Sequence, residues 1–163
     1  MKAIAVPVDT RLARLLPDTS FADAYRISGV MPALNARQAT QAIFDVPAPR
    51  WADALMAVRN RVVGLFGLKP GVRLASSAGV DMIGMFPVLA ESAGEMLLGL
   101  DDRHLDFRIA VTVPAAPADA RQITLTTVVR THNRLGRVYL AVILPFHRLI
   151  VRSMLNRAAR SFG

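Results

Sequence analysis

The strongest constraint on the fold of this chain is a helix-compatible run at residues 135–160, near its C-terminus. At about 100° per residue, apolar side chains fall on one ridge of the predicted helix and basic side chains fall opposite. The apolar ridge comprises Tyr139, Ile143, Phe146, Ile150 and Met154, and the polar stripe comprises Arg148, Arg152, Asn156 and Arg160. We therefore predict an amphipathic helix with a basic outer side.

Pro145 lies in the middle of this run. Because proline has no amide hydrogen and crowds the preceding turn, we expect the helix to kink there. A helix that begins at Pro145 is the alternative, since proline suits a first turn, and residues 138–144 would then form a buried strand. For the longer helix, Asn133 is the predicted N-cap, and Gly136 weakens the first turn.

The same run bears on membrane association. Its uninterrupted apolar part covers nine residues, 138–146, whereas a membrane span needs roughly 20. We therefore expect a helix packed on a sheet rather than a spanning helix. A helix lying on an anionic membrane surface stays open as an alternative, because the polar side carries arginine and asparagine.

Composition narrows the class of protein. The 163 residues fit one domain, 1–163, and the apolar content of 53% predicts either a large core or an apolar surface that faces a ligand, a partner or a membrane. The chain has no cysteine, which excludes disulfides, thiolate metal sites and cysteine nucleophiles. The apolar run at the N-terminus is too short for a signal peptide, so the expected location is cytoplasmic.

The net charge is +8, and 18 of the 20 basic residues are arginine. These arginines are spread from Arg11 to Arg160, without the clustered basic residues and stacking aromatics of a nucleic-acid site. We therefore expect no nucleic-acid partner. Attraction to an anionic membrane surface or to an acidic partner remains open.

Alternation and turn residues predict the order of the elements. After an extended lead-in with a turn at 11–16, we predict a strand (21–30), helices 36–44 and 51–66, and strands 82–89, 95–100, 104–113 and 122–132. Asn35 is the expected cap of the first helix. Short turns make the last three strands antiparallel. The predicted fold class is α+β, a curved antiparallel sheet wrapped around the long C-terminal helix, with two short helices after the first strand.

This order resembles the helix-grip fold of the Bet v 1 and START-related superfamily, which includes polyketide cyclases. Over roughly residues 45–160 the chain resembles, more closely, the bacterial domain-of-unknown-function family 2867. The resemblance is carried by Phe86-Pro87-Val88-Leu89 with Glu91-Ser92, by residues 98–108, by Thr126-Thr127-Val128-Val129 with His132-Asn133, by residues 136–140 and by Pro145-Phe146-His147. It implies an apolar cavity between sheet and helix that holds a small molecule, and it implies no particular reaction. Family members also occur fused to short-chain-dehydrogenase-like domains, but this chain has no Gly-rich dinucleotide loop, so we expect no cofactor.

The strand at 104–113 supplies the predicted pocket wall. Its odd-numbered side chains are apolar and must be buried, most simply against the helix ridge. A filled core without a cavity is the alternative. The predicted ligand-binding residues are Leu105, Phe107, Ile109, Tyr139, Ile143 and Phe146, with the Tyr139 hydroxyl as the polar contact.

The opposite side of that strand carries His104, Asp106 and Arg108. One hypothesis is an acid–base pair in which Asp106 orients His104 and Arg108 holds an anion. We favour a cross-strand polar network on the outer side of the sheet, because these residues oppose the predicted pocket. Catalytic residues therefore stay unassigned.

The remaining polar candidates give weaker signals. His104, His132 and His147 lack metal-ligand spacing, so no metal site is expected. We interpret His147 as solvated and expect Glu91 to pair with an arginine rather than act as an acid at the cavity mouth.

The function predicted from the sequence is the binding of a hydrophobic small molecule. One alternative is a cyclase- or isomerase-type enzyme that uses a carboxylate or a histidine of the cavity. Another is a peripheral membrane or protein-interaction module that uses the basic helix, with a homodimer as one form of it.

Overall fold

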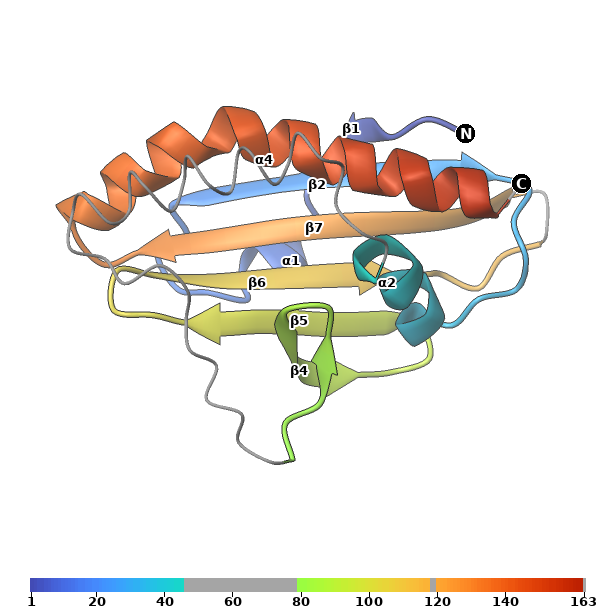
Figure 1. The fold of residues 1–163 in the computed structure, drawn as a ribbon, viewed down its shortest axis with the longest axis horizontal. Helices are drawn as coiled ribbons and strands as arrows, with labels where there is room; N and C mark the ends of the chain where they lie inside the picture. The colour runs from blue at the N-terminus through green and yellow to red at the C-terminus, as the bar shows by residue number, and fades with distance from the viewer. Residues whose placement is uncertain (46–78, 118–119, 163) are drawn as a thin grey trace.

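The computed structural model of this chain describes residues 1–45, 79–117 and 120–162. One antiparallel sheet of seven strands, in the order β1-β2-β7-β6-β5-β4-β3, is covered on one face by a long helix (Figure 1). The α+β prediction with a C-terminal helix is confirmed. The predicted helix at 51–66 lies outside the described residues.

The elements follow the predicted order closely. The strands are β1 (Ile4–Val6), β2 (Phe21–Gly29), β3 (Met82–Ile83), β4 (Phe86–Glu91), β5 (Glu95–Asp101), β6 (Leu105–Thr112) and β7 (Arg121–Thr131). The helices are α1 (Thr10–Ala13), α2 (Ala36–Phe44) and α4 (Arg134–Ser161). Asn35 caps α2 as predicted, in a capping box with Gln38.

The prediction of one strand at 82–89 is wrong. The chain reverses direction between β3 and β4, so this segment contains two short strands. Gly84 has φ = 58°, a left-handed conformation that glycine adopts at little cost. This turn lets Ile83 pair with Phe86 and Met82 pair with Pro87. The apolar composition of both short strands concealed the turn.

The helix α4 is continuous over 28 residues, with Pro145 inside it. The alternative helix that begins at Pro145 is therefore wrong. Asn133 caps α4 as predicted, and its side chain accepts a hydrogen bond of 2.9 Å from the Gly136 amide. The helix arches over β2 and β7 (Figure 1).

The side of α4 that faces the sheet differs from the predicted ridge. Its buried residues are Gly136, Val151, Leu155, Ala158 and Ala159, whereas 38% of Phe146 is exposed. The basic stripe is confirmed at Arg148, Arg152 and Arg160, which are exposed. Small residues mark the buried side because they let the helix approach the strands closely. A Cβ added to Gly136 would stand 2.2 Å from the carbonyl oxygen of His104.

By length and composition, α4 is long and apolar enough to cross a membrane. Only 11% of its most apolar window is buried in the structure. The uninterrupted apolar run at 138–146 covers only nine residues. It did not indicate a helix long enough to span a membrane, because further apolar residues follow Arg148.

The opposite face of the sheet is partly covered by α1, which lies on the far side from α4 in Figure 1. Leu12 and Leu16 are buried, as are Ala24, Ala110 and Thr126 on the outward-facing positions of the strands. This face therefore has a small apolar layer of its own, and polar side chains surround it.

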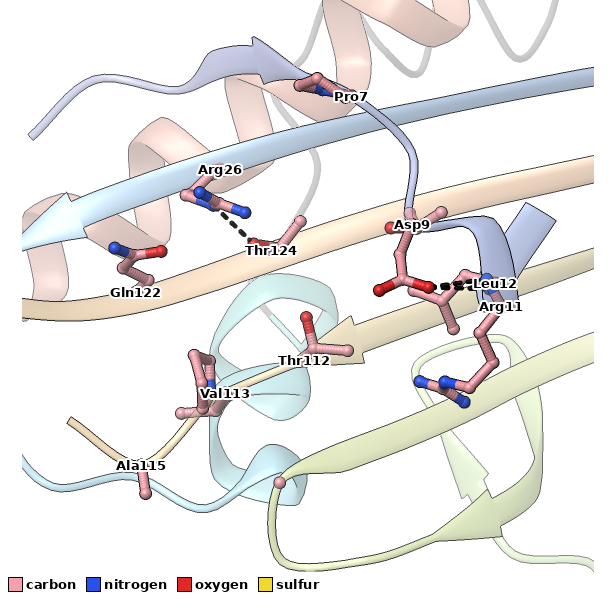
Figure 2. Close-up of a pocket in the computed structure, with 13 residues that line it drawn as sticks. Pro7, Asp9, Arg11, Leu12, Arg26, Thr112, Val113, Ala115, Gln122 and Thr124 are labelled. Atoms are coloured by element: carbon pink, nitrogen blue, oxygen red, sulfur yellow. Dashed lines mark hydrogen bonds between the residues drawn. The ribbon is translucent and has the colours of Figure 1, made fainter.

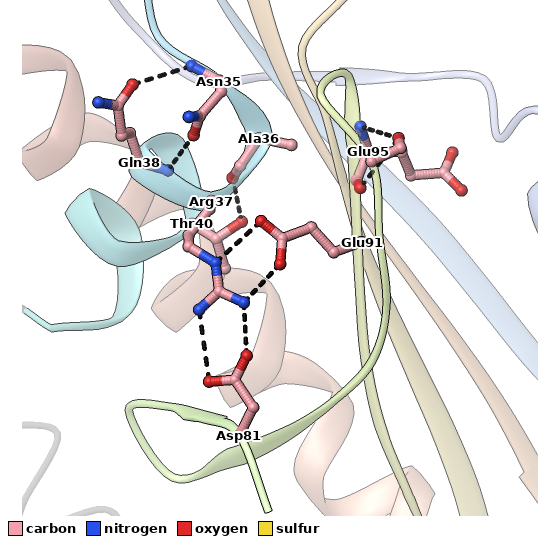
Figure 3. Close-up of polar contacts among 9 residues, drawn as sticks. Asn35, Ala36, Arg37, Gln38, Thr40, Asp81, Glu91 and Glu95 are labelled. Carbon is pink, nitrogen blue, oxygen red and sulfur yellow. Dashed lines mark hydrogen bonds and ion pairs between the residues drawn. The ribbon is translucent and has the colours of Figure 1, made fainter.

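One arginine ties α2 to the edge of the sheet. The Arg37 guanidinium contacts Asp81 and Glu91 (Figure 3). Its Nε donates to Glu91 at 2.9 Å, and its Nη1 donates to Asp81 at 3.3 Å. These hydrogen bonds, more than the charge alone, hold the pKa of both carboxyl groups below their ordinary values. The predicted pairing of Glu91 with an arginine is confirmed.

Because both carboxyl groups have a lowered pKa in the folded state, they add stability above their unfolded pKa, about 4. That stability is lost as the pH falls through the folded values. We expect Arg37→Gln to lower the melting temperature slightly at neutral pH, and the difference from the wild type to vanish near pH 2, roughly. Thermal unfolding across this range, with the exposed Arg14→Gln as control, measures it. A melting-temperature difference that persists near pH 2, roughly, would contradict a stabilising contact of Arg37 with the two carboxylates.

Candidate functional site

A carboxylate and an imidazole meet between the sheet and α4. Asp23 on β2 and His147 on α4 have side chains that are 15% and 20% exposed, and His147 Nε2 lies 3.1 Å from Asp23 Oδ1. The interpretation of His147 as solvated is wrong, because the observed rotation of α4 turns this side chain toward the sheet. An ionisable pair thus occupies an otherwise apolar layer.

The register of the strands explains how this pair is held. Side chains alternate along β2, so Phe21, Asp23 and Tyr25 share the face that α4 covers. The Phe21 and His147 rings lie perpendicular to each other in an edge-to-face contact, with centroids 5.9 Å apart. A carboxylate and an aromatic ring therefore fix the orientation of the imidazole from two sides.

Two polar atoms of this site have no hydrogen-bond partner among the described residues. They are Asp23 Oδ2 and Thr127 Oγ1, both buried. Asp23 and Thr127 are direct cross-strand partners on β2 and β7, so the two atoms belong to neighbouring positions. Leaving a buried polar group unpaired costs about 1–3 kcal/mol, and such groups are normally satisfied by water or by a ligand.

Tyr25 adds a hydroxyl group next to this pair. Burial raises the pKa of Tyr25 above its ordinary value, and the negative charge of Asp23 raises it further. The charges of Arg148 and Arg152 on α4 act in the opposite direction. The Tyr25 hydroxyl is therefore neutral at physiological pH. We call Asp23, Tyr25, Thr127 and His147 the Asp23–His147 cluster.

The cluster contains the groups that move protons in many enzymes. A carboxylate that contacts an imidazole fixes the orientation of the ring. The unpartnered Asp23 oxygen can accept a hydrogen bond, and the Thr127 hydroxyl can donate or accept one. The arrangement can hold a hydroxyl or carbonyl group and exchange a proton with it.

The six predicted pocket residues differ in how deeply they are buried. Ile109 is buried and pairs with Thr127, in one cross-strand row with Asp23. Phe107 is half-buried, and its ring meets that of Phe86 at 5.7 Å. Half-buried positions are also found at Leu105, Tyr139 and Ile143, and Phe146 is exposed. Their role in ligand binding stays a prediction.

The less favoured hypothesis, an acid–base pair of Asp106 and His104, is wrong. Asp106 Oδ1 lies 2.8 Å from His132 Nε2, and His104 Nδ1 lies 3.0 Å from the side-chain nitrogen Nδ2 of Asn133. Arg108 pairs with Asp101 at 2.6 Å. The favoured interpretation, a polar network on the outer side of the sheet, is confirmed. Within the described ranges, no three histidine, aspartate or glutamate side chains gather to hold a metal ion.

The comparison with known families covers most of the chain. The family described as protein of unknown function (DUF2867) matches residues 15–154. The chain belongs to this family. All four residues of the Asp23–His147 cluster lie within the DUF2867 match. No curated protein and no solved structure matches the chain.

Proposed function

We propose that this DUF2867 chain binds an apolar small molecule between the sheet and α4, with the polar group of the ligand at the Asp23–His147 cluster. The observation that carries the proposal is the pair of buried, unpartnered atoms, Asp23 Oδ2 and Thr127 Oγ1, inside an apolar layer. An antiparallel sheet under a long C-terminal helix is also the arrangement of a helix-grip domain, and we propose that fold for the chain.

The two atoms specify the polar group of the ligand. Asp23 Oδ2 needs a donor, and the Thr127 hydroxyl can supply or receive a hydrogen bond. A ligand hydroxyl satisfies both at once, because it donates one hydrogen bond and accepts others. Its apolar body would contact Ile109 and the half-buried side of α4, where Ile143 and Tyr139 lie. The proposed ligand is therefore an apolar alcohol or phenol.

Native mass spectrometry of the purified protein, followed by organic extraction, tests this proposal. We expect a discrete apolar compound with a hydroxyl group, either co-purified or captured from a panel of fatty acids, sterols and aromatic polyketides. Thr127→Val keeps the shape of the side chain and removes the hydroxyl, so we expect it to weaken binding about tenfold, the loss of one hydrogen bond. The unliganded mass alone, across the whole panel, would overturn the proposal.

An enzyme of the cyclase or isomerase kind is the second candidate, and the contact between Asp23 and His147 favours it. In this case the bound compound is a substrate, and His147 exchanges a proton with it. His147→Gln would then abolish turnover and leave binding within a few-fold of the wild type. Equal turnover in the variant and the wild type would exclude this role.

A peripheral membrane module is the third candidate, and the exposed side of α4 favours it. Val138, Val142 and Leu149 are exposed there, and Arg148 and Arg152 are exposed on the same helix. This candidate predicts binding to anionic vesicles that weakens as salt is added. Binding to neutral and anionic vesicles alike, or to neither, would exclude it.

A further inference from the structure

The face of the sheet that points away from α4 carries a polar row across four strands. The register aligns Arg26 on β2 with Thr124 on β7, Thr124 with Thr112 on β6, and Thr112 with Glu95 on β5. Alternation places all four side chains on the same face. This row is independent of the cluster under α4.

A hollow of about 330 Å³ lies over Arg26, Thr124 and Thr112 of this row. Figure 2 shows Arg26, Thr124 and Gln122 on one side of it and Asp9 and Arg11 on the other. Apolar parts of the wall come from Pro7, Leu12, Val113, Pro114 and Ala115. The volume falls at the lower end of the range for small-molecule sites, roughly 300–1,000 Å³.

Among the described residues, the charged side chains of the hollow have different partners: a carboxylate for Arg11, backbone amides for Asp9 and a hydroxyl for Arg26. Arg11 pairs with Glu95, and its Nη1 donates to Glu95 Oε1 at 3.1 Å. Asp9 accepts hydrogen bonds from the Arg11 and Leu12 amides at 2.7 Å and 3.4 Å. Arg26 is half-buried and donates from Nε to Thr124 Oγ1 at 3.0 Å. No carboxylate of the described residues pairs with its guanidinium.

We propose that the hollow binds a small organic carboxylate, with the Arg26 guanidinium as its charged partner. A guanidinium without a carboxylate partner can bind a planar carboxylate through two parallel hydrogen bonds. The Thr112 hydroxyl and the Gln122 amide supply further donors at the same wall. Among the described residues that line the hollow, Arg26 is the guanidinium without a carboxylate partner, and the Asp9 carboxylate lies on the other side. One guanidinium opposite a carboxylate matches a monocarboxylate better than a doubly charged phosphate. The apolar wall accommodates the hydrocarbon part of the acid.

Isothermal titration with benzoate, hexanoate and inorganic phosphate tests this site. We expect one benzoate or hexanoate per chain, and weaker binding of phosphate. Arg26→Gln should weaken carboxylate binding at least tenfold, whereas Arg14→Gln, outside the hollow, should retain it. If Arg26→Gln does not fold, Thr124→Val serves as the second variant. It removes the hydroxyl that accepts from the Arg26 guanidinium, and it should change the affinity for the carboxylate at least threefold.

Three results would overturn the proposal. The first is the lack of saturable carboxylate binding at about 10 mM, which corresponds to only a few kcal/mol of binding free energy. The second is equal affinity in the wild type and in a folded Arg26→Gln variant. The third is tighter binding of phosphate than of either carboxylate, which would contradict the assigned chemical class.

Discussion

Replacing Gly136 by alanine is expected to lower the free energy of unfolding by about 1–3 kcal/mol or more, the usual cost of overpacking. The added Cβ would stand 2.2 Å from the His104 carbonyl oxygen, so the start of α4 must move away from the sheet. Such a movement also strains the hydrogen bond between the Gly136 amide and Asn133. Helix propensity alone predicts the opposite sign, a gain of about 1 kcal/mol.

Urea unfolding of the wild type, Gly136→Ala and Gly94→Ala measures this effect. Gly94 is the matched control, because the nearest atom to its added Cβ is the Val113 carbonyl oxygen at 3.4 Å, an ordinary contact. We expect the Gly94 variant to stay within about 0.5 kcal/mol of the wild type. A Gly136 variant as stable as the control would show that the helix does not start against His104.

Leu155→Ala is expected to cost about 2–5 kcal/mol, because it empties a fully buried site under α4. Leu155 is 0% exposed and belongs to the main core. Leu149 on the same helix is 55% exposed, so Leu149→Ala should cost about 0.5 kcal/mol or less. The pair isolates burial, since the chemical change is identical.

The rotation of α4 is tested by a third truncation in the same urea series. Phe146 belongs to the ridge that the sequence predicts as buried, yet 38% of it is exposed. Phe146→Ala should therefore cost less than Leu155→Ala, although phenylalanine is the larger side chain. A larger cost for Phe146→Ala than for Leu155→Ala would mean that the predicted ridge faces the sheet and that His147 does not.

Much of the fold could be predicted because its signals are local. Alternation defined β5, β6 and β7 to within about two residues, and the caps Asn35 and Asn133 defined where α2 and α4 begin. The rotation of α4 about its axis was harder to predict. Residues 138–146 are apolar on every side of the helix, so their pattern does not indicate which side faces the sheet. Gly136 and the alanines near the C-terminal end of the helix held that information.

The candidate site was missed because it joins two elements distant in sequence. Asp23 interrupts an apolar face of β2 that it shares with Phe21 and Tyr25, and this interruption was the available signal. His147 could be placed opposite it only with the rotation of α4 known. The pairing of Asp23 with Thr127 depends on the register between β2 and β7, which local patterns do not determine.

Ligand binding between the sheet and α4 is the central claim, and NMR of the three histidine rings tests it most directly. His147 belongs to the Asp23–His147 cluster, His132 pairs with Asp106 on the outer side, and His104 contacts Asn133. Titration with the captured compound, or with a sterol and a phenolic polyketide in turn, should shift the His147 signal to saturation and leave the other two in place. Unchanged His147 signals with every compound, or equal shifts of His132, would contradict the claim.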